Sequence, residues 1–224
     1  RSGNFQQQGQ MLQQALANAV TDTDRKEILT EMGEVLHLKM NETEQGLSFY
    51  RRALEVDPHY VPALEQLEKH AVERGNNVEL VDILSAKAKG LAEPEQVAAT
   101  KLRVGGIYES TLGQPEKAAQ AYREVLDADA SNVLAMRGLE RVHQQLQQWP
   151  ELVSVLEMQL DVVATERDRI EVLMKIAKIQ EELFVKPDAA ALRLEQVVEI
   201  DPNFEPALEG LARCYRQRRQ WLDL

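Results

Sequence analysis

The chain has 224 residues, of which 44% are hydrophobic, 28% charged and 5% aromatic, and its formal net charge is −11. This composition is typical of a folded protein and too apolar for a disordered one. The negative charge argues against nucleic acid or an anionic membrane as the main partner, because both require a positive surface. No run of about 18 apolar residues is present, which argues against insertion into a membrane. Arg1 to Gln10 does not resemble a secretory signal peptide, which weakly favours a cytoplasmic location.

The apolar residues of this chain recur at helical spacing, and Pro, Gly and polar clusters mark the breaks between helices. Pro94 and Pro115 suit first helical positions, and Ser131 is expected to cap the helix that follows it. Short turns make consecutive helices antiparallel. In chain order we expect helices near residues 5–19, 25–40, 43–56, 60–74, 77–90, 94–112, 115–127, 135–146, 149–160, 167–183, 187–199 and 204–218.

The sequence repeats itself at a fixed shift along the chain. Asp57, Asp129 and Asp201 are equally spaced, since 129 − 57 = 72 and 201 − 129 = 72. The same shift superposes two further sets of identical residues, namely Ala63, Ala135 and Ala207, and Leu67, Leu139 and Leu211. A period of this size indicates one supersecondary unit copied along an axis. We expect a single domain over 1–224, with a partial copy at 1–24 and copies at about 25–96, 97–168 and 169–224. The chain lacks a starting Met, so we expect it to be a fragment of a longer array.

Each copy contains two helical hairpins, and the first resembles a known repeat. In the middle copy, Leu102 to Tyr108 is followed by Gly113, by Pro115, and by a small, an aromatic and a second small residue. The three copies fill those last positions with Gly46, Tyr50 and Ala53, with Ala118, Tyr122 and Val125, and with Ala190, Leu194 and Val197. This pattern resembles the tetratricopeptide repeat of about 34 residues. The match is degenerate. The first hairpin has about one residue more, between Tyr108 and Gly113, and in the second Gln147 to Leu152 replaces the Gly turn.

The resemblance implies an all-α fold, a right-handed α-solenoid of stacked antiparallel helix hairpins, similar to bacterial scaffold proteins. It implies a groove lined by the first helix of each hairpin and a protein or peptide partner bound there. It implies no enzyme and no cofactor. The alternatives are an architectural spacer, or a regulatory or recruitment domain of a larger protein.

The most suggestive polar residues lie on the first helices of the second hairpins. Lys69, Arg141 and Arg213 are related by the 72-residue shift, and Glu65, Arg137 and Glu209 precede them by four residues on the same face. By the family alignment this position faces the groove, so the cations could bind an acidic segment or a terminal carboxylate. The competing interpretation is that Glu65 pairs with Lys69, and Glu209 with Arg213, within one helix.

Other candidate sites have weaker support. The family's carboxylate clamp requires Asn, which none of the aligned positions supplies. Those positions hold Glu34, Gly106, Lys178, Lys69, Arg141 and Arg213. A basic patch of Arg213, Arg216, Arg218 and Arg219 is interpreted as helix-end cations. Trp149 and Trp221 are expected to pack between helices, and Cys214 to be a half-buried thiol. The four histidines show no metal-ligand spacing, so no metal site is expected: His37, His59, His70 and His143.

The first helix predicts one further contact. Residues 5–19 match residues 77–91 of the next copy, yet no helix precedes them. Met11, Leu12, Leu16 and Val20 would therefore be exposed. End repeats of such arrays normally carry a polar outer face. This apolar end indicates either fraying or end-to-end self-association.

Overall fold

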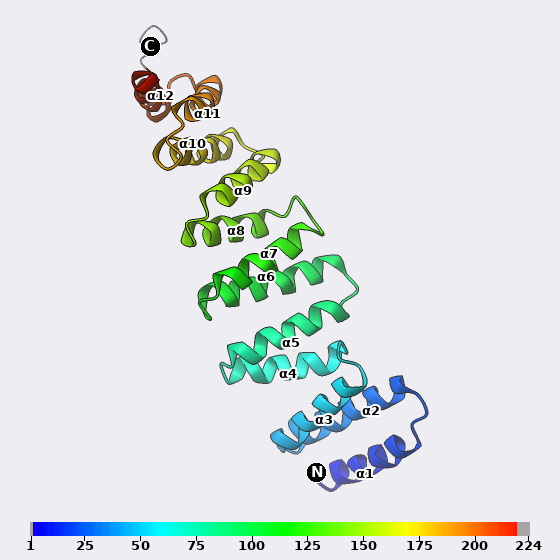
Figure 1. Cartoon of the computed structure of the whole chain (residues 1–224). Helices are drawn as coiled ribbons and strands as arrows, with labels where there is room; N and C mark the ends of the chain where they lie inside the picture. The colour runs from blue at the N-terminus through cyan, green and yellow to red at the C-terminus, as the bar shows by residue number, and fades with distance from the viewer. Residues whose placement is uncertain (1, 219–224) are drawn as a thin grey trace. The chain divides into compact units, whose positions relative to one another are not determined.

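The computed structural model describes residues 2–218, and the side chains of residues 5–217. Over this part of the chain every regular element is a helix and no strand is present, which confirms the all-α prediction. The helices divide into two compact units, Arg1–Gln114 and Pro115–Leu224. Figure 1 shows the helices in chain order within each unit.

Unit 1 contains six α-helices, with a π-helical turn, η1, that extends the second. Their bounds are α1 Ser2–Asn18, α2 Asp22–Glu34, η1 Val35–Lys39, α3 Thr43–Val56, α4 Val61–Glu73, α5 Asn77–Gly90 and α6 Pro94–Ser110. In unit 2 the described helices are α7 Pro115–Leu126, α8 Val133–Gln145, α9 Trp149–Val162, α10 Glu166–Glu182, α11 Pro187–Ile200 and α12 Glu205–Arg218. Within each unit every helix packs against the next one in the chain. The short connections turn consecutive helices back on each other as antiparallel hairpins.

The 72-residue period of the sequence also appears in the backbone φ angles. Asn41, Gly113 and Val185 have φ of 60°, 59° and 53°, and they are related by the same shift, since 113 − 41 = 72 and 185 − 113 = 72. Gly75 and Gln147, with φ of 65° and 55°, are related in the same way, since 147 − 75 = 72. These residues follow helices, where a left-handed residue ends the helix and reverses the chain. The conformation is thus kept even where Gly is replaced by Asn, Gln or Val.

In each first hairpin, the first helix ends in a π-type turn, which is wider than an α-helical turn and accommodates the additional residue. The backbone N–H groups of Met40, Leu112 and Phe184 each donate to a carbonyl five residues earlier, at 3.0, 3.0 and 3.1 Å. These three positions are related by the same shift as the copies. In the first copy the wide turn extends over η1, Val35–Lys39. Such π-type turns insert one residue into a helix without breaking it.

The Asp residues that revealed the repeat form the same turn in each copy. Oδ1 of Asp57, Asp129 and Asp201 accepts the backbone N–H two residues later, at 3.0 Å in all three. The prediction that Ser131 caps the next helix is wrong. Asn132 is the capping residue, since its side chain accepts the N–H of Ala135 at 3.1 Å, whereas the Ser131 hydroxyl donates to Asp129 at 2.7 Å.

The small and aromatic positions of the first hairpins form the core. Tyr50, Tyr122 and Leu194 are at most 3% exposed, and the small residues that flank them are buried too. Close helix approach explains part of this burial. A Cβ on Gly138 of α8 would lie 2.6 Å from the Tyr122 ring of α7, and one on Gly33 of α2 would lie 2.5 Å from the Tyr50 ring of α3. None of the described helices is long and apolar enough to span a membrane.

Candidate functional site

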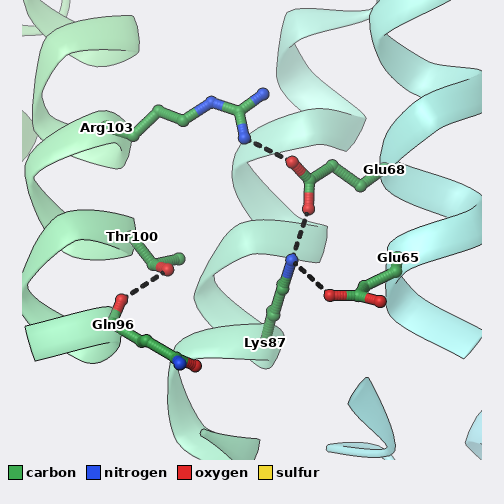
Figure 2. Close-up of polar contacts among 6 residues, drawn as sticks. All are labelled: Glu65, Glu68, Lys87, Gln96, Thr100 and Arg103. Atoms are coloured by element: carbon green, nitrogen blue, oxygen red, sulfur yellow. Dashed lines mark hydrogen bonds and ion pairs between the residues drawn. The ribbon is translucent and has the colours of Figure 1, made fainter. Parts of the chain in front are cut away.

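Side chains connect helices that are two apart in the chain. In unit 1 Glu68 of α4 accepts hydrogen bonds from Lys87 of α5, at 3.0 Å, and from Arg103 of α6. Lys87 Nζ also forms an ion pair with Oε1 of Glu65, at 3.2 Å. Figure 2 shows the Glu68 carboxylate between the two cations, with one oxygen toward each. This carboxylate therefore joins three consecutive helices.

The electrostatics of Glu68 follow from this position. Its side chain is 15% exposed, and burial alone would raise its pKa. The hydrogen bonds from Arg103 and Lys87 outweigh that effect, and the pKa of Glu68 lies below its ordinary value of 4.5. Burial would likewise lower the pKa of Lys87, but the bonds to Glu68 and Glu65 raise it. The group is a fully charged structural joint at neutral pH.

The same joint recurs in unit 2. Adding 72 to Glu68, Lys87 and Arg103 gives three residues that make the equivalent contacts: Glu140, Gln159 and Lys175. Gln159 of α9 donates to Glu140 of α8 at 2.8 Å, and Lys175 of α10 donates to it at 2.9 Å. Lys175 also pairs with Glu171 at 2.9 Å. The joint fixes α8 against α10 on the face that the even-numbered helices share.

That face of unit 2 contains a hollow of about 650 Å³ between α10, α11 and α12. Its size falls within the range of protein ligand sites. Apolar side chains line its floor, chiefly Ile170, Met174, Leu194 and Phe204. The charged residues of its lining are Arg167, Glu171, Lys175, Lys178, Glu181, Glu182 and Arg213.

A second hollow, of about 420 Å³, lies on the other side of α10, between α8 and α9. Trp149, Leu152 and Leu156 contribute to its apolar lining. Lys175, Lys178 and Glu182 line both hollows. We call the two hollows together the even-helix groove of unit 2. Its centre is α10.

Two of the four cations that line the larger hollow are bound by carboxylates of the same unit. Lys175 is held by Glu140 and Glu171. Arg213 of α12 donates from Nε and from a terminal nitrogen to the two oxygens of Glu181 on α10, at 3.1 and 3.3 Å. This bond raises the pKa of Arg213. Arg167 and Lys178 are exposed and bond no carboxylate of the described residues.

The six residues expected to form a groove stripe are all exposed, but among them Arg213 alone lines the even-helix groove of the described chain. Lys69 and Glu65 lie on α4 in unit 1, Arg137 and Arg141 on α8, and Glu209 on α12. Whether they contact a partner stays a prediction.

The competing prediction of pairs within one helix is wrong for the bonded partners, although the charge of Glu209 also contributes to raising the pKa of Arg213. Glu65 bonds Lys87 of α5, and Arg213 bonds Glu181 of α10. Packing between helices therefore supplies the partner in each case. Arg167 and the apolar floor of the groove were missed by sequence reasoning, since Arg167, Ile170 and Met174 lie on α10, the first helix of a different hairpin, and Leu194 and Phe204 belong to later segments. Applying the 72-residue shift to Glu68 and Arg103 would have pointed to Glu140 and Lys175.

Two of the remaining candidates, Cys214 and Trp149, belong to the packing of unit 2. Cys214 is fully buried in the core of unit 2 with Leu173 and Val197, rather than half-buried as expected. Trp149 is partly buried and packs against the core between α9 and α10. No group of three or more His, Cys, Asp or Glu among the described residues is placed to hold a metal ion. The Arg218 side chain, Arg219 and Trp221 lie outside the described residues.

Comparison with protein families gives three matches along the chain. Models described as "Tetratricopeptide repeat" match residues 27–60, 98–132 and 135–170. The third match covers α8 and α9, which is the hairpin type that departs furthest from the pattern in sequence. Both hairpin types therefore contribute a recognised repeat. No curated protein matches the chain.

Several solved structures are similar to this chain. YrrB, described as a TPR protein with an unusual peptide-binding site, is 16% identical over 88% of this chain and 96% of its own, with a TM-score of 0.46. The C-terminal part of a repeat-containing protein from Cytophaga hutchinsonii is 17% identical over 87% and 75%, with a TM-score of 0.45. PilF of Pseudomonas aeruginosa is 17% identical over 95% and 91%, with a TM-score of 0.42.

Proposed function

Because this chain is a tetratricopeptide repeat protein, we propose that it acts as an interaction scaffold that holds a segment of a partner protein in the even-helix groove of unit 2. Repeats of this kind serve as protein interaction modules with extended binding surfaces. In this proposal the chain contributes binding and no catalytic step. The observation that carries it is the pair of hollows on either side of α10.

The lining of the groove supports a peptide rather than a small polar metabolite. Ile170, Met174 and Phe204 give an apolar floor, and charged side chains surround it. Interaction surfaces commonly combine an apolar centre with a polar rim. Met is also a flexible and polarizable side chain that adapts to bound apolar groups.

Site-specific photo-crosslinking tests this function in cells. A photoreactive phenylalanine analogue at position 174, in the groove, should crosslink to a discrete partner protein. The same analogue at Ser154, an exposed residue that lines a different hollow beside α7 and α9, serves as the control. The crosslinked partner is then purified and titrated against the chain by calorimetry.

The outcomes separate the candidate functions. A partner that crosslinks from position 174 and binds in the titration supports the scaffold. Equal crosslinking from both positions, or none from either, contradicts groove binding and favours an architectural spacer. A partner with enzymatic activity would favour recruitment for catalysis elsewhere.

Self-association through α1 is a second proposal. Met11 of α1 is 60% exposed and Val20, which follows α1, is 86% exposed, whereas Leu12 and Leu16 are half-buried rather than exposed as expected. Burying Met11 and Val20 against a second copy would remove this surface from water. Sedimentation velocity should then show a concentration-dependent dimer that Met11→Glu abolishes. A wild-type monomer at every concentration would contradict the idea.

A further inference from the structure

We infer that the segment bound in the even-helix groove is extended and carries two acidic residues with a bulky apolar residue between them. This inference rests on the proposed function, since it specifies what the same groove binds. It concerns the chemistry of α10, whose charged and apolar residues are arranged along one side of the helix.

The two cations that bond no described carboxylate lie in line on α10. Arg167 and Lys178 are separated by eleven positions (178 − 167 = 11), which is about three helical turns, so they point to the same side. At a rise of about 1.5 Å per residue their Cα atoms are about 16 Å apart. An extended peptide spans this distance with about five residues.

Between the two cations α10 presents two apolar side chains to the larger hollow, beside the ion pair of Glu171 with Lys175. Ile170 and Met174 follow Arg167 by three and seven positions, and both line the larger hollow. Phe204, which precedes α12, faces them across it. An apolar side chain of a bound segment would rest on this floor while carboxylates on either side reach Arg167 and Lys178. The spacing therefore favours an acidic residue, an apolar residue near the middle and a second acidic residue.

Charge supports an acidic segment of limited length. The chain as a whole has a net charge of −11, yet four cations line the larger hollow against three carboxylates. Two of those carboxylates, Glu171 and Glu181, are bound to Lys175 and Arg213. Of the four cations that line the larger hollow, Arg167 and Lys178 therefore remain available to bind a ligand. Glu182 would repel a long polyanion, so a nucleic acid fits this surface poorly.

Selection from a random peptide library tests the inference without knowledge of the partner. The full chain is immobilised and screened against phage that display random dodecapeptides. Enriched sequences should carry two Asp or Glu residues about five positions apart, with Leu, Ile, Met or Phe between them. One enriched peptide is then synthesised with a fluorescent label and its affinity measured by anisotropy.

Variants of the groove give the expected loss. Arg167→Ala and Lys178→Ala should each weaken the labelled peptide about fivefold, the size expected for one exposed charge pair. Arg123→Ala is the matched control, because Arg123 is an exposed cation of the same unit that lines a different hollow. It should leave the affinity unchanged. Thermal melting by circular dichroism confirms that each variant is folded.

A charge-reversal experiment completes the test. The Lys178→Glu variant should lose affinity for the selected peptide. It should instead bind a version of the peptide in which the acidic residue at one end is replaced by Lys. Enrichment of basic or uncharged peptides that still depend on Met174 would overturn the acidic assignment while leaving groove binding intact. Failure of any peptide to bind, or binding that ignores Met174→Ala, would overturn groove binding itself.

Discussion

At the scale of single residues, the left-handed positions show how strongly the backbone is imposed by the repeat. Val185 adopts φ of 53°, a region that costs about 1–2 kcal/mol for residues with a Cβ and is least favourable for β-branched ones. Gly113 occupies the equivalent position without that cost. The surrounding helices therefore hold Val185 in a strained conformation.

We predict that Val185→Gly raises the free energy of unfolding by about 1 kcal/mol, because relief of strain exceeds the entropy that Gly adds to the unfolded chain. Val185 is 74% exposed, so little burial is lost. Urea denaturation followed by circular dichroism measures the change. The reciprocal variant, Gly113→Val, should lower stability by a similar amount. A destabilised Val185→Gly protein would show that the turn is not strained.

At the scale of helices, the close approach of α7 to α8 depends on Gly138, because glycine has no side chain. A Cβ on Gly138 would lie 2.6 Å from the Tyr122 ring, so α8 must move or Tyr122 must leave its rotamer. Gly106 of α6 has no atom within 4 Å of its own added Cβ. The same substitution should thus have opposite effects at the two positions.

Gly138→Ala is expected to lower the free energy of unfolding by about 1–3 kcal/mol through overpacking. Gly106→Ala should raise it by up to about 1 kcal/mol, because Ala is the better helix former. Thermal and urea melts of both variants provide the measurement. Equal effects of the two substitutions would contradict the close approach of α7 and α8.

The joint between α4, α5 and α6 predicts a dependence of stability on pH. The folded-state pKa of Glu68 is lowered from 4.5, so its ionised form is favoured by folding. Its contribution is fully present above about pH 4.5 and is lost as the pH falls through the folded-state pKa. Glu68→Gln should therefore be less stable than wild type at pH 7, by about 1–3 kcal/mol.

The stability difference between Glu68→Gln and wild type should shrink as the pH falls below about 4.5. Urea melts across a pH series test this. Glu44→Gln provides the control, since Glu44 is 77% exposed and its pair with Arg74 is 3.9 Å long. Such pairs contribute little. A pH-independent difference for Glu68→Gln would show that the carboxylate is not the source of the effect.

At the scale of the whole chain, the two units should respond separately to damage. Val197 in unit 2 and Ala53 in unit 1 are both 0% exposed, and they occupy the same repeat position, since 197 − 53 = 144. An Asp at either place would bury an unpaired charge, which costs several kcal/mol. Repeat proteins are stabilised mainly by neighbouring contacts, so such damage stays local.

Hydrogen exchange measured by mass spectrometry should show this separation. Val197→Asp is expected to abolish protection in α10, α11 and α12 while leaving α3 and α4 protected. Ala53→Asp should give the reverse pattern. Uniform loss of protection in both variants would instead indicate a single cooperative unit.

The helices were predictable from sequence because Pro and Asp recur near their ends in every copy, and Gly marks the turn in some of them. Most predicted bounds fall within a few residues of those in the structure. The groove was much less predictable. Lys175 and Arg213 find their partners on helices two apart in the chain, and spacing within one helix cannot reveal such contacts. Ser131 was chosen as a cap although Asn132 follows it, because both residue types suit that role.

The recurrence of the carboxylate joint constrains how a protein of this kind can change in length. Duplication of one whole copy would bring a new Glu, such as Glu140, to face the equivalents of Lys87 and Arg103. A single hairpin would not, because the alignment that matches Lys69 with Glu34 and Gly106 places Gly33 and Gly105 at the position of Glu68 in the neighbouring hairpins. Such an insertion would leave the two cations without a carboxylate partner. Genetic insertions and deletions in this array should therefore be tolerated in pairs of hairpins rather than singly.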